Sequence, residues 1–225
     1  DTSPFTDTDM VFLENCFEKI KAMKESQEQC DVTLVVGGTE FRVHRVALVG
    51  ASEYFRKLFD EKYAKELQDR FVLNDCEADT MSVILDFIYS GILNVDDFNF
   101  AEILHLCDYF GIELAKEVCA EYAIENVSSD NCVEIYILGD IYGLPEICRY
   151  AKTTIMSNLE AISGTEAFFE LPIRHIEDIF TKPLGCHDKE LLYRVVIRWV
   201  QYDLPCRKKF LKNLLDAVER EHVSL

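Results

Sequence analysis

The sequence is short of positive charge. Lysine and arginine account for 23 of the 225 residues, aspartate and glutamate for 41, and the formal net charge is −18 at pH 7. A chain with this charge is repelled by the phosphate backbone of nucleic acids and by anionic lipid headgroups. We therefore expect no nucleic-acid partner and no membrane-surface partner.

Long apolar runs are also missing. No run approaches the roughly 20 consecutive apolar residues that span a bilayer. The first residues, Asp1 to Pro4, contain no initiator methionine and neither the basic nor the apolar segment of a signal peptide. From these absences we expect a fragment of a longer protein that does not cross a membrane.

Common catalytic motifs are absent as well. The sequence has no Gly-x-x-x-x-Gly-Lys-Ser/Thr, no Gly-x-Gly-x-x-Gly and no Gly-x-Ser-x-Gly motif, and its five histidines do not share metal-ligand spacing. One cluster, Cys186-His187-Asp188, pairs a nucleophile with a base in sequence, but adjacent side chains point away from each other. The favoured alternative is a loop in which Asp188 caps the next helix. We expect no catalytic residue, no metal and no cofactor.

The cysteines form no ligand cluster. There are nine, an odd number, with wide spacing and no Cys-x-x-Cys pair. Most lie on apolar helical faces, where cysteine serves as a small apolar side chain, and zinc binding has no support. This use of cysteine is typical of a reducing compartment. We expect a cytoplasmic protein, with the nucleus as a second location.

What the sequence does contain is enough apolar material for a core, including 15 phenylalanines and 10 tyrosines. The first half alternates strand and helix patterns. Strands are predicted at 31–36 and 39–43, joined by a hairpin turn at Gly37-Gly38, and a third short strand at 71–73. These features predict an α+β domain.

Helices fill the rest of this first half. Apolar residues at helical spacing predict helices at 10–25, after an N-cap at Ser52, and at 79–90 before Gly91. Another helix is expected after a cap at Asp96 or Asp97, ending at Gly111, and one further helix is marked by its apolar residues, Leu114, Val118 and Tyr122.

The second half has no strand pattern. Helices are predicted near 131–142, 146–159, 166–170, 173–180, 188–202 and 206–220. The polar joint at 126–130 is too short for a flexible linker. The predicted domains are therefore residues 1–125, with an N-terminal helix, and an all-helical domain at 126–225.

Three polar or aromatic residues are expected to be structural. His44 follows a strand and opens a helix, where a buried histidine bonded to backbone is the favoured interpretation. His105 is expected to be a half-buried packing residue. Trp199 shares a helical face with three apolar residues, Leu192, Val195 and Val196, so we expect it in the core.

Acidic residues are concentrated in the middle of the chain. Residues 94–146 contain 12 acidic residues and one basic residue, Lys116. One interpretation is a solvated face of the protein. The other is a surface that attracts a basic partner.

The helix at 10–25 carries an apolar stripe on an otherwise charged surface. The stripe consists of Phe12, Leu13, Cys16, Phe17 and Ile20. Either the helix folds back onto its own chain, or the stripe packs against a second subunit.

Several sequence fragments together resemble the BTB (POZ) domain. They are Asp31-Val32-Thr33-Leu34, Phe41-x-Val43-His44-Arg45, Leu48-x-x-x-Ser52-x-Tyr54-Phe55-x-x-x-Phe59 and Leu85-Asp86-Phe87-Ile88-Tyr89-Ser90-Gly91. The second half is similar to the BACK domain, through Asn131-Cys132, Tyr142-Gly143-Leu144, Glu166-x-Phe168-Phe169-x-Leu171, Glu190-x-x-Tyr193-x-x-Val196-x-x-Trp199, and Asp203 with Arg207. The resemblance implies an α+β BTB/POZ domain followed by an all-α BACK domain.

The resemblance also implies a function. BTB–BACK proteins of the kelch-like family are substrate adaptors of ubiquitin ligases built on the cullin-three scaffold. In them the BTB domain forms a homodimer and binds the cullin, and a C-terminal kelch propeller recruits the substrate. No kelch repeat is present in this sequence, so the substrate would be held by an absent C-terminal module and is unknown.

Site residues follow from the same resemblance. The dimerisation residues would be Phe12, Leu13, Cys16, Phe17 and Ile20, with the charged pair Asp31 and Arg45 nearby. The cullin-binding residues would be Tyr54, Phe55, Leu58, Phe59, Tyr63, Lys65, Glu66, Tyr109 and Phe110.

One position departs from the family pattern. Cullin-binding members carry an apolar-x-Glu motif where this chain reads Tyr63-Ala64-Lys65, and Glu66 follows one residue later. Lys65 therefore favours an alternative, a dimeric BTB scaffold that does not use the cullin, linked to the cytoskeleton or to transcription. An enzyme is a third hypothesis, which no motif supports.

Overall fold

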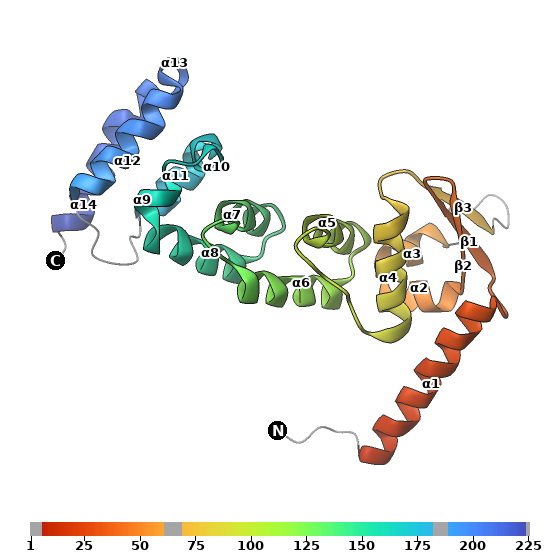
Figure 1. Ribbon diagram of the computed structural model, residues 1–225. Helices are drawn as coiled ribbons and strands as arrows, with labels where there is room; N and C mark the ends of the chain where they lie inside the picture. Colours follow the sequence, from red (N-terminus) through yellow and green to blue (C-terminus); the bar gives the residue numbers. More distant parts are fainter. Residues whose placement is uncertain (1–5, 61–68, 182–188, 224–225) are drawn as a thin grey trace. The chain divides into compact units, whose positions relative to one another are not determined.

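The computed structural model describes residues 6–60, 69–181 and 189–223, and the chain divides into two compact units, Asp1–Glu121 and Tyr122–Leu225 (Figure 1). In the described part of the chain, no helix combines the length and the apolar content that a bilayer crossing requires. Each unit has its own apolar core and is described separately below.

The first unit contains a small mixed sheet. Strand β1 (Val32–Val36) pairs antiparallel with β2 (Thr39–Val43) and parallel with β3 (Arg70–Leu73), in the order β2-β1-β3. The hairpin is closed by Gly37 and Gly38, whose φ angles of 54° and 87° lie in the left-handed region that glycine adopts readily. The predicted strands and the predicted turn are confirmed.

The other regular elements of this unit are helices. They are α1 (Asp7–Ser26), α2 (Arg45–Ala51), α3 (Glu53–Leu58), α4 (Ala78–Ser90), α5 (Phe100–Phe110) and α6 (Glu113–Asn126), whose last turn reaches the second unit. Helix α4 packs against α1, α2 and α5, and α3 packs against α5. Figure 1 shows that α1 extends away from the hairpin of β1 and β2, with its N-terminal half unaccompanied by other elements of this unit.

Local sequence signals correctly predicted where most of these helices begin or end. Ser52 accepts a hydrogen bond from the backbone N–H of Phe55 at the start of α3, and Gly91 and Gly111 end α4 and α5 with positive φ. The prediction of an Asp96 or Asp97 cap is wrong, because α5 begins only at Phe100. Asp96 instead accepts backbone hydrogen bonds within the turn that precedes this helix.

Helix α6 forms as predicted, but it buries a different face. Its fully buried residues are the small side chains Ala115, Cys119 and Ala123, whereas Leu114 is exposed. The buried face of this helix is therefore the one with small side chains, and not the one with the largest apolar side chain. The thiols of Cys107, Cys119 and Cys132 are buried and free, which agrees with their expected use as apolar side chains.

The two histidine predictions had opposite outcomes. His44 is buried at the β2–α2 corner, as expected: its Nδ1 lies 2.8 Å from the Tyr89 hydroxyl and its Nε2 lies 2.9 Å from the Glu28 carbonyl. The His44 backbone N–H donates to the same hydroxyl, so Tyr89 donates to Nδ1 and the Nε2–H donates to Glu28. The His105 prediction is wrong, because this side chain is exposed on the surface of α5.

The described residues of the second unit form helices only, as expected. They are α7 (Cys132–Ile141), α8 (Pro145–Ser157), α9 (Leu159–Ile162), α10 (Glu166–Glu170), α11 (Ile173–Thr181), α12 (Lys189–Tyr202), α13 (Leu204–Arg207), the 3-10 turn η1 (Lys208–Phe210) and α14 (Leu211–Val223). Helix α7 packs along α8, and α12 runs beside α14 (Figure 1). The helix predicted at 206–220 is broken into α13, η1 and α14.

Trp199 anchors this second core, which confirms its structural role. It is almost fully buried, and its indole N–H donates to the Leu171 carbonyl at 3.1 Å. The guanidinium of Arg207 lies 4.1 Å above the indole ring and donates to the Trp199 carbonyl. This stacking fixes the turn between α12 and α13. The predicted cluster Cys186-His187-Asp188 lies outside the described residues.

Candidate functional site

The apolar stripe of α1 is exposed. Phe17 and Phe12 are 51% and 67% exposed, Leu13 and Ile20 are also open to solvent, and Cys16 is half-buried. A soluble helix normally turns such a stripe towards a core, because apolar area left in water is unfavourable. In the described part of the chain, no other residues cover most of the stripe. The structure therefore does not support the alternative in which this helix folds back onto its own chain.

Among the described residues, an ion pair and a cation–π contact hold the C-terminal end of α1 against its own unit. The Lys24 ammonium lies 2.7 Å from the Asp86 carboxylate of α4 and 5.3 Å above the Tyr89 ring. At the other end, Thr6 and Asp9 form a capping box that satisfies backbone donors of the first turn. These hydrogen bonds from Thr6 lower the pKa of the Asp9 carboxyl. The helix is therefore well formed, yet it presents its stripe outward.

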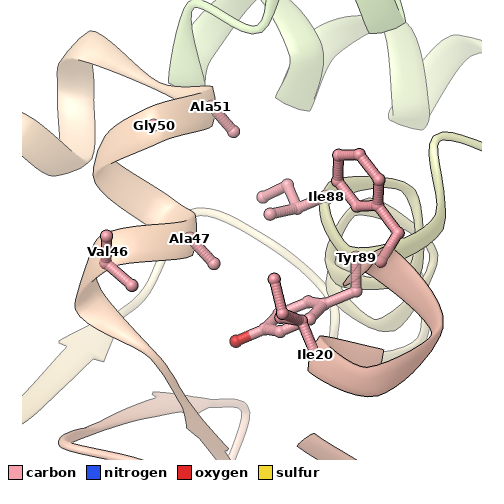
Figure 2. Close-up of a pocket in the computed structure, with 8 residues that line it drawn as sticks. Ile20, Val46, Ala47, Gly50, Ala51, Ile88 and Tyr89 are labelled. Atoms are coloured by element: carbon pink, nitrogen blue, oxygen red, sulfur yellow. The ribbon is translucent and has the colours of Figure 1, made fainter. Parts of the chain in front are cut away.

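A groove of about 390 Å³ lies beside this stripe. Figure 2 shows Val46, Ala47, Gly50 and Ala51 of α2 along one wall, facing Ile88 and Tyr89 of α4, with Ile20 of α1 beside them; Phe17 also lines the groove. Val46 is 80% exposed. Stripe and groove together form a continuous apolar surface, which we call the α1 surface.

The groove was missed by sequence reasoning, although a signal exists. Val46 and Gly50, and likewise Ala47 and Ala51, are four residues apart and so share one face of α2. Small residues at this spacing make a flat face that admits a bulky partner side chain. This signal indicates a helix face, but it does not indicate what packs against it.

The predicted charged pair has a local structural role. The Asp31 carboxylate accepts the backbone N–H of Arg45 at 2.7 Å, which places a negative charge at the N-terminus of α2, where the helix dipole favours it. The Arg45 guanidinium lies 5.0 Å from the Phe59 ring centre. Neither residue lines the groove, so their part in a dimer interface remains a prediction.

A second candidate surface is an aromatic cluster at α3 and the end of α5. The rings of Phe55 and Phe110 stack at 5.0 Å, and the Tyr54 ring contacts both of them and Tyr109. Ser52 links the two helices, because its hydroxyl donates to the Phe110 carbonyl at 2.5 Å. The cluster therefore positions one helix end against the other.

Two of its predicted contact residues need correction. Phe55 and Phe110 are 0% exposed, because they fill the space between α3 and α5, so they support the surface and do not form it. Tyr54, Leu58 and Phe59 are half-buried, and Tyr109 is 41% exposed. These four side chains remain available to a partner. The other predicted contacts, Tyr63, Lys65 and Glu66, lie outside the described residues.

The aromatic cluster keeps its buried tyrosine hydroxyl neutral. Burial, and then the hydrogen bond with Tyr109, raises the pKa of Tyr54 well above its ordinary value, so its hydroxyl stays protonated. Among the described residues, no group of three or more acidic, histidine or cysteine side chains is arranged to hold a metal ion. What both surfaces offer is apolar and aromatic contact area.

Comparison with known proteins identifies both units. A BTB/POZ domain family model matches residues 20–127, and a model described as BTB And C-terminal Kelch (BACK) matches residues 132–225. A solved structure, the BTB domain of zebrafish PATZ1, aligns with 54% of this chain and 97% of its own at 20% identity and a TM-score of 0.47.

Curated relatives align along nearly the whole chain. Kelch-like protein 21 of Danio rerio is 29% identical over 216 residues, which are 96% of this chain and 35% of the relative. Kelch repeat and BTB domain-containing protein 2 of Homo sapiens is 26% identical over 92% of this chain and 33% of its own length, and human Kelch-like protein 11 is 29% identical over 89% and 30%. The chain thus spans about a third of the length of these relatives. With a BTB domain followed by a BACK domain, the chain belongs to the kelch-like BTB–BACK family.

Proposed function

We propose that this chain is the dimerising and cullin-docking part of a substrate adaptor for a cullin-three RING ubiquitin ligase. The observation that carries the proposal is the α1 surface, an apolar helix stripe and groove that the described residues of the same chain leave uncovered. The family supports it, because its kelch-like members combine these two domains with a substrate-binding module.

The mechanism of such an adaptor is proximity. The BTB domain docks the cullin N-terminal domain, and the BACK domain positions a further C-terminal module that binds the substrate. Holding a substrate lysine near a charged ubiquitin-conjugating enzyme raises the effective concentration of the two reactants. The adaptor makes and breaks no bond, so we propose a binding protein and not an enzyme. We retain the proposal of a cytoplasmic location, with the nucleus second.

The α1 surface fits a homodimer. In a two-fold dimer both copies use the same patch, so each apolar side chain of the stripe is buried once in each copy. Phe12, Leu13 and Phe17 would supply the bulky side chains, and the small residues of α2 would receive them. An interface of this kind joins two substrate-binding modules in one ligase.

The cullin would use the other surface of this unit. Tyr54, Leu58, Phe59 and Tyr109 present partly exposed apolar and aromatic area, held in place by the buried stack beneath them. Tyrosine and phenylalanine are enriched at the centre of protein interfaces because they bury a large area with few rotatable bonds. Docking on this surface leaves the α1 surface for the dimer.

The proposal is tested by calorimetric titration of the whole chain with the cullin-three N-terminal domain. We expect the wild-type chain to bind this domain. Because the family resemblance implies a glutamate at the position of Lys65, we expect Lys65→Glu to tighten binding by about tenfold to a hundredfold. Lys212→Glu makes the same charge change in the second unit and should leave the affinity unchanged. Absence of binding by both the wild type and Lys65→Glu contradicts the cullin function.

The second candidate is a dimeric BTB scaffold that uses no cullin, and Lys65 is the residue that favours it. Such a protein would share the α1 surface and the dimer but not the cullin contact. The same titration separates the two functions, because a scaffold forms the dimer and gives no heat with the cullin domain. Intrinsic turnover without added ligase components would instead support an enzyme.

A further inference from the structure

Helix α1 is charged unevenly along its length. Its first ten residues, 7–16, contain three acidic residues and no basic one, whereas its last ten, 17–26, contain three lysines and two glutamates. The helix dipole favours such an order, but only within the first and last turns. Glu14 and Lys21 lie further inside the helix, so the dipole does not account for them.

The charges beside the apolar stripe keep this order. Glu14 and Lys21 lie three and four residues from Phe17, so both border the stripe on the same flank. The two glutamates of the second half, Glu18 and Glu25, are seven residues apart and share the opposite face of the helix. On its stripe side, α1 therefore has an acidic N-terminal half and a basic C-terminal half.

Glu14 and Lys21 are not used within their own chain. Both side chains are exposed, and in the described part of the chain neither forms an ion pair. They lie two turns apart, beyond the three- and four-residue spacings at which side chains of one helix interact. By contrast, the Asp9 carboxylate accepts hydrogen bonds from Thr6, and Lys24 is paired with Asp86.

The groove of the α1 surface indicates which parts of two copies meet. Phe17 and Ile20, from the C-terminal half of α1, line it, whereas Phe12 and Leu13, from the N-terminal half, do not (Figure 2). A dimer that inserts Phe12 and Leu13 of one copy into the groove of the other lays the N-terminal half of one α1 along the C-terminal half of its mate. The two-fold axis repeats this contact with the roles exchanged, so the two α1 helices run antiparallel.

We propose that the α1 surface selects a second copy of this same chain in the antiparallel arrangement, because Glu14 of each copy then pairs with Lys21 of the other. The inference rests on the dimer of the proposed function. A two-fold axis across an antiparallel helix pair brings the same flank of both helices together. With the axis at Cys16, in the middle of the stripe, the two charges lie within about one helical turn of each other along the helix direction.

These ion pairs act on the choice of partner more than on the strength of binding. Exposed ion pairs contribute little to affinity, which comes from the apolar side chains of the stripe. A like charge facing each residue is repulsive, however, so the order of charges discriminates between partners. A parallel pair of α1 helices would bring the two acidic halves together. A partner that has the apolar stripe but a different charge order would lose both attractive contacts.

The test mixes two charge variants of the whole chain. The dimer of Glu14→Lys contains two lysine–lysine contacts and that of Lys21→Glu two glutamate–glutamate contacts, whereas the mixed dimer contains two attractive pairs. One variant carries a mass label, and the dimers are counted by native mass spectrometry after equilibration at low ionic strength. We expect the squared amount of mixed dimer, divided by the product of the two unmixed dimers, to exceed its value for random exchange by about tenfold. Effects of each substitution on its own helix cancel in this ratio.

The matched control mixes Glu18→Lys with Lys57→Glu. These variants make the same charge changes at exposed positions, one on the opposite face of α1 and one on α3, and they should exchange at random. High salt should bring the first mixture towards random exchange as well, because it screens exposed charges. Dimers of Glu14→Lys and Lys21→Glu that exchange at random, or an equal excess in the control mixture, overturn the pairing and leave the dimer standing. A monomeric wild type overturns the proposed dimer and the pairing together.

Discussion

Phe17→Asp is expected to convert the dimer into monomers. Phe17 is half exposed in the isolated chain and lines the groove of the α1 surface. Burial of one such side chain stabilises an interface by about 1.5–3 kcal/mol, and a two-fold dimer buries two of them. Aspartate removes that contribution and places a carboxylate in an apolar groove. The dimer dissociation constant should rise by a factor of about 100 or more.

The measurement is mass by light scattering or sedimentation over a series of concentrations. Phe98→Asp is the matched control, because Phe98 is 100% exposed, lies in the turn before α5 and belongs to the same unit. It carries the same substitution and should leave the mass unchanged. If Phe17→Asp keeps the dimeric mass while its circular dichroism matches the wild type, the dimer interface lies elsewhere.

Much of the fold follows from local signals that the sequence displays. Gly37-Gly38 specifies a tight hairpin because both residues adopt positive φ, and Gly91 and Gly111 end helices for the same reason. Ser52 caps α3 with its own hydroxyl. Each of these features depends on neighbours within a few residues, so they were predicted without knowledge of the tertiary structure.

The candidate sites depend on contacts that are distant in sequence. The groove of the α1 surface combines residues of α1, α2 and α4, and three of its eight lining residues are alanine or glycine, which contribute little to a hydrophobic pattern. Helix α6 poses the same difficulty, because its buried residues are small and its larger Leu114 points to solvent. Periodicity identifies an apolar helix face, but it does not identify which face is buried when the buried side chains are small.

The aromatic cluster shows a further limit. Tyr54, Phe55, Leu58 and Phe59 all belong to one short apolar segment, yet only Phe55 is fully buried. Which of them faces the core depends on where α5 ends, and Phe110 at that end comes 55 residues after Phe55 in the chain. The sequence resemblance therefore indicated the region of the surface, while the structure separates its support from its exposed side chains.

This separation predicts a large loss of stability for a substitution at Phe55 and a small one for a substitution at Leu58. Phe55→Ala removes a fully buried ring that stacks between Phe59 and Phe110, and it leaves a cavity between α3 and α5. Such a substitution lowers the free energy of unfolding by about 3–5 kcal/mol. Because domains of this size are stable by only about 5–15 kcal/mol, the loss should be a large fraction of the total. The urea midpoint of the first unit, followed by circular dichroism, should fall accordingly.

Leu58→Ala is the matched comparison on the same helix. Leu58 is half-buried, so its truncation should lower the stability by only about 1 kcal/mol. If the cullin docks here, this variant should remain folded and bind the cullin domain more weakly, because the lost contact area belongs to the interface. If instead Phe55→Ala leaves the urea midpoint near the wild-type value, the ring is not a core residue. The buried stack would then no longer explain how Tyr54, Leu58 and Tyr109 are held in place.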